Sequence, residues 1–324
     1  MFEVINIEKH GGSQFQFADD YHNLVNRISA DLIIAEKKWI LVLSAPPGVT
    51  RELKDIVEDY PKKRQVNTII GKFRGRLYRF MKGSFENILM KDAQLEEEFF
   101  IEWDEIFDAY ENRVRIMDSK DQICWRKGIL TLGEMANLHV IKFLFKRAGV
   151  EVFTATDEDY IFRHIEVTPK RGKIQPKTFE NILNWDFLKK KSGVALVPGF
   201  TGLWVHENQE GLTNLGMEGS DLTPLPYYKA LYEEKITHNR LVTLDYFKGI
   251  SFKDFSGGVG NLKPETLFYG KSLMGQQFTD FVKSHGSPGW DIGVCTSGPP
   301  PSSPCRLYFL TISHLIKNKA EETV

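Results

Sequence analysis

Apolar runs that each end in a glycine-containing turn constrain the fold of this chain most strongly. "FEVINI" leads into "EKHGGS", "WILVLS" at residues 39–44 leads into "APPGVT", and "GVALVPGF" at 193–200 ends in a glycine turn. Each run has the length of a strand, and helical patterns follow the first two. Alternation of strand, turn and helix favours a mainly parallel sheet with helices on both faces, which predicts an α/β fold.

Helical patterns continue this alternation along the chain. Residues 19–38 form one pattern, another begins at Glu52, and the segment that starts "GEMANLHVIKFLFK" stops at Gly149 before a further strand. A helix is also expected over 222–234, ahead of a strand at 240–247. The side chains expected to face inward are Leu24, Ile28, Leu32 and Ile33 in the first helix, and Leu138, Ile141, Leu144 and Phe145 in the third.

Two segments depart from the alternation. Residues 69–110 are charged, aromatic and periodic, which predicts helices that project from the sheet as a lid or a dimer surface. The tail at 286–324 begins with a stretch rich in Gly, Pro and Ser, so we expect a loop there. The apolar run "RLYFLTISHLI" that follows is expected to dock on the body of the protein.

Length, charge and cysteine content limit the class of protein. A chain of 324 residues can bury the core of one large domain or two modest ones. A net charge of -1 gives no long-range attraction to nucleic acid or to an anionic membrane, so neither is expected as a partner. The 3 cysteines contain no CxxC pair, and the N-terminus has no signal-peptide pattern. We therefore expect a cytoplasmic protein.

Three glycine turns are candidate phosphate sites because backbone N–H groups in such turns attract anions. They are "KHGGS" at 9–13, "SAPPGVT" at 44–50 and "GMEGSD" at 216–221. Taken singly, each is better explained as a tight connection between elements. The chain has neither a GxxxxGK[ST] nor a GxGxxG motif.

The set of motifs and their order are more specific than any single turn. "EKHGGS", "VLSAPPGVT", "LTLGEMANLHVIKFLFKRAGVEV", "ALVPGFTGL" and "TNLGMEGSD" follow one another along the chain. In this order they resemble the aspartate kinases of the amino-acid kinase family, whose patterns are KFGGTS, VSAxxGVT, a GE-containing helix start, PGFxG and TLGRGGSD or TLGREGSD. Weaker matches are "TLDYFKGI" and "PETLFYGKSL". The resemblance covers roughly residues 3–275, with poor matching between 60 and 120.

The resemblance implies a three-layer α/β sandwich that transfers the γ-phosphoryl group of ATP to a carboxylate with Mg²⁺ as cofactor. Such chemistry depends on positioning and charge neutralisation. The positions that match the family's motifs fall into three groups. The catalytic candidates are Lys9, Gly11, Gly12, Ser13 and Asp221, the substrate-binding candidates are Ser44, Glu134, Met217 and Ser220, and the nucleotide-binding candidates are Gly48, Thr243, Asp245 and Lys248. No residue is assigned as a metal ligand.

Several of these positions have a structural explanation beside the functional one. Glu134 matches a glutamate that contacts substrate, where a carboxylate can receive an amino group, but it is also a first-turn acid favoured by the helix dipole. Ser220 and Asp221 match GSD, yet either can cap the next helix. His10, which stands where the family has phenylalanine, is expected to be a packed residue rather than an acid or base.

Departures from the family pattern concern the substrate and the nucleotide. Met217 occupies the position of an arginine that would grip a carboxylate through paired hydrogen bonds, which a thioether cannot replace. Thr154 and Thr156 replace an aspartate and an arginine. The segment "SFKDFSG" after Gly249 has lost a proline and an arginine. These changes point to a substrate that differs from ordinary L-aspartate, or to weak activity, as would suit a specialised biosynthetic pathway.

The predicted organisation is a catalytic domain at 1–285 and the tail at 286–324. The catalytic domain has a substrate-side lobe at 1–205 and a nucleotide-side lobe at 206–285. The residues after 285 are too few for the family's regulatory ACT domains, so none is expected. A homodimer that binds ATP and an amino-acid-like molecule is the leading expectation. The alternatives are a catalytically silent binding or partner subunit, and a different transfer reaction on the same fold.

Overall fold

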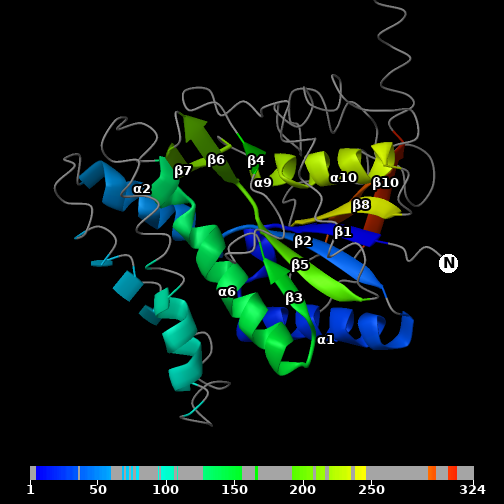
Figure 1. Ribbon diagram of the computed structural model, residues 1–324, viewed down its shortest axis with the longest axis horizontal. Coiled ribbons are helices and arrows are strands. Elements are labelled where there is room, and N and C mark those ends of the chain that lie inside the picture. Colours follow the sequence, from blue (N-terminus) through cyan, green and yellow to red (C-terminus); the bar gives the residue numbers. More distant parts are fainter. Residues whose placement is uncertain are drawn as a thin grey trace, which may run out of the picture.

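The computed structural model shows a mainly parallel sheet between layers of helices, as Figure 1 illustrates. It describes residues 5–35, 37–59, 68, 71–72, 74–75, 78–79, 94, 96–105, 108, 127–154, 165–166, 192–206, 209–215, 219–234, 238–245, 291–296 and 306–311. The predicted α/β fold with helices on both faces of a mainly parallel sheet is confirmed.

Within the described part of the chain, seven strands form the central sheet, in the order β10-β9-β8-β1-β2-β5-β3. Neighbouring strands are parallel except for the antiparallel pair of β9 and β10. β1, β2 and β5 are buried along their whole length, which explains the apolar runs of β2 and β5. The strands are β1 (Ile5–His10), β2 (Lys38–Leu43), β3 (Val152–Thr154), β5 (Gly193–Pro198), β8 (His238–Asp245), β9 (Asp291–Thr296) and β10 (Arg306–Thr311).

Helices cover both faces of this sheet. α1 and α6 lie on one face and contact each other, whereas α10 contacts β1 and β8 from the other face (Figure 1). α2 packs on α6. α6 ends before Gly149, whose φ of 74° belongs to the left-handed region typical of helix ends. The helices are α1 (Ala18–Ala35), α2 (Val49–Asp59), α6 (Leu132–Arg147), α9 (Gly219–Leu222) and α10 (Pro224–Glu233).

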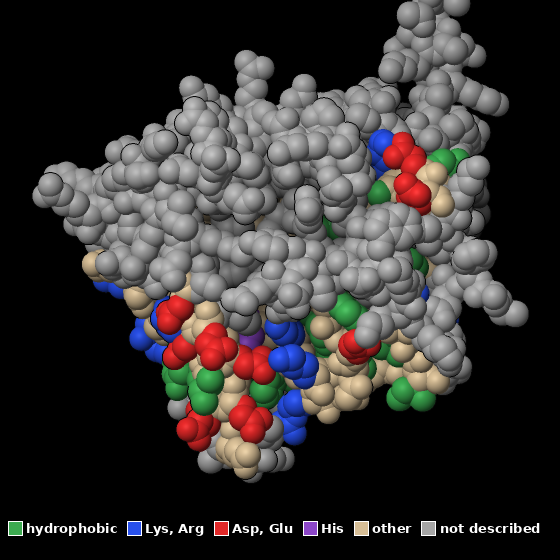
Figure 2. All heavy atoms as spheres, viewed as in Figure 1, with side chains coloured by type: hydrophobic (Ala, Val, Ile, Leu, Met, Phe, Trp, Pro, Cys, Tyr) green, Lys and Arg blue, Asp and Glu red, His purple; other side chains and the backbone are tan. Residues whose placement is uncertain are grey.

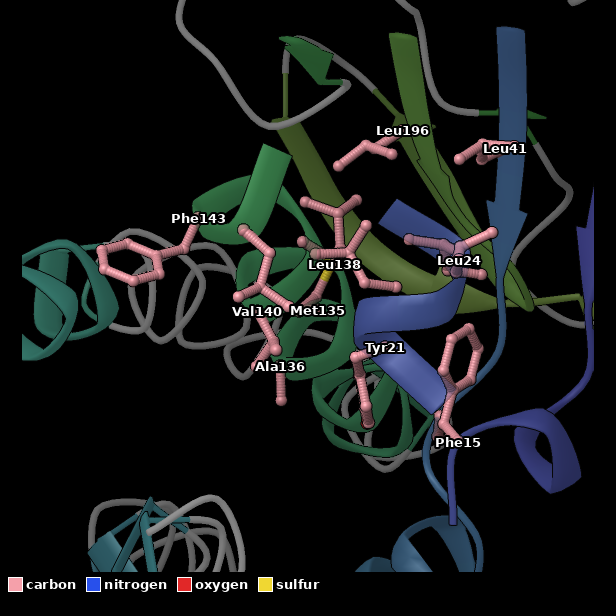
Figure 3. Packing of buried hydrophobic residues seen from close by; sticks show 14 of the residues in the cluster. Phe15, Tyr21, Leu24, Leu41, Met135, Ala136, Leu138, Val140, Phe143 and Leu196 are labelled. Carbon is pink, nitrogen blue, oxygen red and sulfur yellow. The ribbon is translucent and has the colours of Figure 1, made fainter. Parts of the chain in front are cut away.

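The main core lies between the sheet and the pair of α1 and α6. Figure 3 shows side chains of both helices meeting Leu41 and Leu196 from the strands. The residues predicted to face inward from α6 are all buried, as are Leu24, Ile28 and Leu32 of α1. The prediction for Ile33 was wrong, because this side chain is 80% exposed. Consecutive residues are about 100° apart around a helix, so a residue next to buried Leu32 turns away from the core.

A second, small sheet was not predicted from the sequence. β4 (Ile165–Glu166), β6 (Thr201–His206) and β7 (Gln209–Asn214) form it in the order β4-β6-β7, with β6 and β7 as an antiparallel hairpin. The hairpin follows β5 directly and leads back to α9. The hairpin therefore brings the start of α9 back beside the end of β5.

The tail contributes to the sheet instead of forming only a loop. Residues 291–296, expected to be part of a Gly- and Pro-rich loop, form β9 parallel to β8, which corrects that prediction. Ile292 and Val294 alternate with smaller residues there, and the surrounding Gly, Pro and Ser residues obscure this short period-2 pattern. Residues 306–311 form β10 beside β9, so the predicted docking of the apolar run is confirmed for them.

One helix, Lys127–Arg147, is long and apolar enough to cross a membrane by length and composition. However, 89% of its apolar window is buried inside the protein, as expected for a helix of a globular core. Helical residues 96–105 pack on it through Phe99, whose ring centroid is 4.9 Å from that of His139 and 5.1 Å from that of Phe143. Residues 69–110 are thus helical where the structure describes them, and the lid or dimer role stays a prediction.

Candidate functional site

The turns after β1, β2 and β5 meet at one edge of the sheet, because parallel strands end on the same side. The backbone N–H of Ser44 donates to the His10 carbonyl at 3.0 Å, which joins the first two turns. The N–H of Gly199 donates to the Leu43 carbonyl at 2.7 Å, which joins the third turn to the second. Segments that are far apart in sequence are thus held together by backbone hydrogen bonds.

Glycines allow these turns to touch. A Cβ atom placed on Gly12 would lie 2.2 Å from the carbonyl oxygen of Ala45, and one on Gly133 would lie 2.8 Å from the Ala45 Cβ. A Cβ on Gly199 would lie 3.0 Å from the Cβ of Ser220. The first three sequence motifs therefore meet at Ala45. The fourth lies beside them, because Gly199 contacts Leu43, and the fifth contacts the fourth through Ser220.

Lys9 and Asp221 form an ion pair at this convergence. The Nζ atom of Lys9 lies 2.7 Å from Oδ1 of Asp221, and the two side chains are 2% and 14% exposed. Lys9 comes from β1 and Asp221 from α9, so the folded chain brings the first and last motifs into contact. A buried ammonium group needs a counter-charge, which the carboxylate supplies. Both residues that match the family's charged catalytic positions are therefore side by side.

The turn after β1 is compact. Gly12–Gln14 form one turn of 3-10 helix, and the N–H of Gln14 donates to the Gly11 carbonyl at 2.9 Å. Gly11 is buried, while Gly12 and Ser13 are half-buried. In the second turn Gly48 has a φ of 84°, a conformation that favours glycine just before α2. Gly12 and Gly48 are thus sites where the backbone approaches another turn closely or adopts a conformation that favours glycine, whereas Gly11 has an ordinary extended backbone with a φ of -68°.

Glu134 lies in the first turn of α6 and is 3% exposed. Burial raises the pKa of its carboxyl group to about 8, against the opposing effect of hydrogen bonds from the backbone N–H groups of Glu134 and Ala45. Its Oε2 atom has no hydrogen-bond partner among the residues that the structure describes. A cationic group placed at Oε2 would favour ionisation, so this carboxyl group is suited to receive an amino group.

Ser44 lies close to this helix end. Asn137, one turn beyond Glu134, donates from Nδ2 to the Ser44 carbonyl at 2.7 Å. Within the described part of the chain, the Ser44 hydroxyl is buried and has no hydrogen-bond partner. Asn137 was not identified from the sequence, although its position three residues after Glu134 places it on the same face of the helix.

Ser220 and Asp221 lie inside α9 and do not cap the next helix. The N-cap of α10 is Thr223, so the capping explanation for the two earlier residues was wrong. The Thr223 hydroxyl accepts the N–H of Phe200 at 3.1 Å and donates to the Gly219 carbonyl at 3.0 Å. These bonds hold Phe200, whose φ of 64° is rare for an aromatic residue, and tie the third turn to α9.

His10 is packed, as predicted. It is 4% exposed, and its Nε2 donates to Oε2 of Glu8 at 3.0 Å. Burial lowers the pKa of the imidazole, which outweighs the opposing effect of Glu8. Arg27 of α1 also binds Glu8. Sequence reasoning missed Glu8 and Arg27, although three consecutive ionisable residues, Glu8, Lys9 and His10, at the end of a strand were a visible signal.

Other predicted positions are less directly connected to the site. In the sheet register Thr243 of β8 lies opposite Lys9, and Asp245 is the last residue of that strand. Thr154 is fully buried at the end of β3, which β2 and β5 separate from β1. Met217, Lys248 and Thr156 lie outside the described residues.

The described residues contain no group of three or more His, Cys, Asp or Glu side chains that could hold a metal ion. Among the described residues in Figure 2, acidic and basic side chains are interspersed over the lower part of the face, without a block of one sign.

No protein-family model and no curated protein sequence matches the chain. Solved aspartate kinases match its structure. The enzyme of Clostridium acetobutylicum covers 95% of this chain and 62% of its own, with a TM-score of 0.56 and 16% identity. Aspartokinase III of E. coli in complex with aspartate and ADP covers 95% of this chain and 64% of its own, with a TM-score of 0.56 and 16% identity. The same enzyme in complex with lysine and aspartate covers 93% of this chain and 63% of its own, with a TM-score of 0.56 and 15% identity.

This likeness shows an aspartate-kinase-like fold. The chain spans less than two thirds of the length of each of these three structures.

Proposed function

We propose that the protein is an ATP-dependent kinase that phosphorylates a carboxyl group of an amino-acid substrate related to L-aspartate, giving an acyl phosphate. The observation that carries the proposal is the 2.7 Å ion pair of Lys9 and Asp221 beside the glycine turn at the carboxyl end of β1. The neighbouring buried carboxyl group of Glu134 and the hydroxyl of Ser44 supply further polar groups at the same edge of the sheet.

The reaction needs no covalent intermediate on the protein. A carboxylate oxygen of the substrate attacks the γ-phosphorus, the bond from that phosphorus to the β,γ-bridging oxygen breaks, and ADP leaves with the electron pair. A carboxylate is already ionised at neutral pH, so no base has to remove a proton. Lys9 and the backbone N–H groups of Gly11, Gly12 and Ser13 stabilise charge on the transferred group.

Asp221 orients Lys9 in this scheme. Without a counter-charge, a lysine that is 2% exposed would favour its neutral form, which stabilises a phosphoryl group less well. The ion pair keeps Lys9 charged and fixes the direction of its side chain before the substrate arrives. Preorganised charge of this kind lowers the cost of reaching the transition state.

The substrate would bring an amino group to Glu134 and a hydrogen-bonding group to Ser44 and Ser220. Met217 stands where a carboxylate-binding arginine would be expected, so the end of the substrate that faces it is less acidic than in aspartate. This assignment predicts a lower KM for L-aspartate in Met217→Arg than in the unmodified protein. An unchanged KM with every amino acid would refute this role of the 213–221 loop.

The residues at the sheet edge fit the phosphates of ATP. The turn at Gly12 leaves no room for a side chain beside Ala45, and the space around Gly48 in the second turn is open. Lys9 supplies a buried positive charge. Thr243, Asp245 and Lys248 would serve the nucleotide on the β8 side of Lys9. Mg²⁺ would bind mainly through phosphate oxygens and water, as it does in other phosphoryl-transfer sites.

Two measurements test the proposal together. Mg·ATP at millimolar concentration should raise the melting temperature, since a ligand selective for the native state adds stability. Hydroxylamine should trap an acyl phosphate with L-aspartate or another amino acid as substrate, and mass analysis identifies the product. Lys9→Met should abolish the product, while Lys146→Met, on the exposed end of α6, should not. Retained product formation in Lys9→Met would refute the mechanism.

A catalytically silent binding or partner subunit is the second candidate, favoured by the loss of motif residues at 154, 156 and 217. The absence of both a melting shift with Mg·ATP and a trapped product with any amino acid would support this second candidate over the kinase. A homodimer in the cytoplasm remains part of the proposal. Light scattering coupled to size-exclusion chromatography measures the mass in solution and tests the dimer.

A further inference from the structure

β1 places two ionisable side chains on the face of the sheet that α1 covers. Side chains alternate along a strand, so Glu8 and His10 point to one face and Lys9 to the other. In the register with β2, Glu8 lies opposite Leu41 and His10 opposite Leu43, and both leucines belong to the main core. Burying a carboxylate and an imidazole beside such residues costs free energy unless they are paired.

Arg27 of α1 completes the pairing. Its NH2 donates to Oε2 of Glu8 at 2.6 Å and its NH1 to Oε1 at 3.2 Å, so the guanidinium group binds both oxygens. The same Oε2 receives Nε2 of His10 at 3.0 Å. The three side chains form a network that begins at a residue with 44% side-chain exposure and ends at one with 5%. The guanidinium carbon also lies 5.3 Å from the ring centroid of Trp39.

Stability alone is a weak reason for such a network. Replacing a buried ion pair by apolar side chains of similar volume is often neutral or stabilising. The inner end of this network is instead the last residue of β1, directly before the Gly11–Ser13 turn. The carbonyl of His10 accepts the N–H of Ser44, and the residue before it is Lys9. Two side chains that flank Lys9 are therefore fixed from the opposite face of the sheet.

We propose that Arg27, Glu8 and His10 form a positioning network that fixes the carboxyl end of β1, and with it the direction of Lys9 and of the Gly11–Ser13 turn. Arg27 acts through Glu8 and His10 and does not contact a ligand. The consequence for phosphoryl transfer rests on the proposed function, whereas the fixing of the turn does not.

Arg27→Gln tests the network at its most exposed residue. The matched control is Arg147→Gln, which removes the same charge from the exposed last turn of α6. In the ligand-free protein, hydrogen–deuterium exchange should become faster in peptides covering 8–14 and 40–46 for Arg27→Gln and remain unchanged for the control. Unchanged exchange in both variants would overturn the network, whether or not the protein binds ATP.

Kinetics give the second readout. Arg27→Gln should lower kcat roughly tenfold with little change in the KM of the acceptor, since positioning of Lys9 matters most in the transition state. The acid limb of the pH–rate profile should move to higher pH, because Arg27 lowers the pKa of both Glu8 and His10. The other charged groups acting on His10 are Glu8 and Lys9, which both variants retain. A wild-type profile in Arg27→Gln would contradict the proposal.

An apolar replacement separates positioning from stability. The triple variant with Glu8→Leu, His10→Phe and Arg27→Met should unfold at the same or a higher urea concentration than the unmodified protein. Its kcat should nevertheless be as low as that of Arg27→Gln. A triple variant with full kcat would show that the network serves packing only. If the unmodified protein transfers no phosphoryl group while exchange responds as expected, the proposed function fails and the positioning network stands.

Discussion

The amino end and the middle of α6 each bury a titratable side chain, but in different surroundings. Glu134 lies at the sheet edge, where one of its oxygens has no hydrogen-bond partner among the described residues. His139 lies where helical residues 96–105 pack, between the rings of Phe99 and Trp103, with ring centroids 4.9 and 5.6 Å from its own. Its Nε2 donates to the Phe99 carbonyl at 3.2 Å, and its Nδ1 is buried without a hydrogen-bond partner among the described residues.

Burial moves both groups towards the neutral form, in opposite directions on the pH scale. It raises the pKa of Glu134 to about 8 and lowers the pKa of His139 to about 3. The Phe99 carbonyl opposes the second shift, while Lys142 and Lys146 add to it. His139 is therefore enclosed by aromatic rings that favour its neutral form, whereas the sheet edge keeps a carboxyl group that a cationic partner would ionise. This difference separates a structural histidine from a candidate binding group.

The largest expected effect comes from Glu134. Its folded pKa is above that of the unfolded chain, so stability is full below about pH 4.5 and falls as pH rises towards about 8, by about 1.4 kcal/mol per pH unit. Glu134→Gln removes this slope. Urea unfolding should show the variant to be more stable than the unmodified protein at about pH 7.5 and not at about pH 4.5. Equal slopes would place the Glu134 carboxyl group in water.

The second effect concerns His139 and has the opposite sign. Its folded pKa is below that of the unfolded chain, so stability is full above about pH 6.5 and falls as pH decreases, by about 2 kcal/mol at about pH 5. His139→Gln keeps a donor for the Phe99 carbonyl but does not titrate. The free energy of unfolding should therefore depend less on acid in this variant, and His22→Gln on α1 is the matched control. A dependence unchanged by His139→Gln would contradict the assignment.

Glycine substitutions sharpen the comparison between a tight and an open region. Gly12→Ala would put a Cβ 2.2 Å from the Ala45 carbonyl and should destabilise the protein by about 1–3 kcal/mol, with loss of any Mg·ATP response. Gly71→Ala meets no atom within 4 Å on its helix and should stabilise by about 0.5–1 kcal/mol. Thermal melts of the two variants give the answer. A harmless Gly12→Ala would mean that the two turns are farther apart.

The smallest effect is expected for the ion pair between Lys146 of α6 and Glu102, whose atoms are 3.1 Å apart. Both side chains are at least a third exposed, so Glu102→Gln should cost less than about 1 kcal/mol, and the cost should vanish in high salt. Urea unfolding at two salt concentrations measures it. A large, salt-independent loss would show that charge, and not aromatic packing, holds helical residues 96–105 to α6.

The sequence allowed the main sheet to be predicted because its strands are buried on both faces. β2 and β5 appear as apolar runs ending in glycine turns, and β1 begins in a shorter one, a local pattern that needs no knowledge of the partner strands. The β6–β7 hairpin and β9 were missed. Their strands are short and mix polar or glycine residues, so their pairing is decided by tertiary neighbours that local propensity does not reveal.

The candidate site was predictable in part for a similar reason. Ordered motifs identified Lys9 and Asp221, and the fold brings these two side chains together. The contact itself was not predictable, because it depends on how α9 returns from the hairpin after β5. Glu8, Arg27 and Asn137 were missed since each acts through a side-chain hydrogen bond to another segment, and none carries a motif of its own.

The pairing of Lys9 with Asp221 also has a consequence during synthesis of the chain. Lys9 leaves the ribosome long before α9 exists, and a contact between such distant residues forms only after the intervening chain is ordered. Until then the lysine has no carboxylate from α9. A nascent or truncated chain that stops before residue 219 therefore holds the glycine turns without the charged pair, so fragments of this protein would not carry out the proposed reaction.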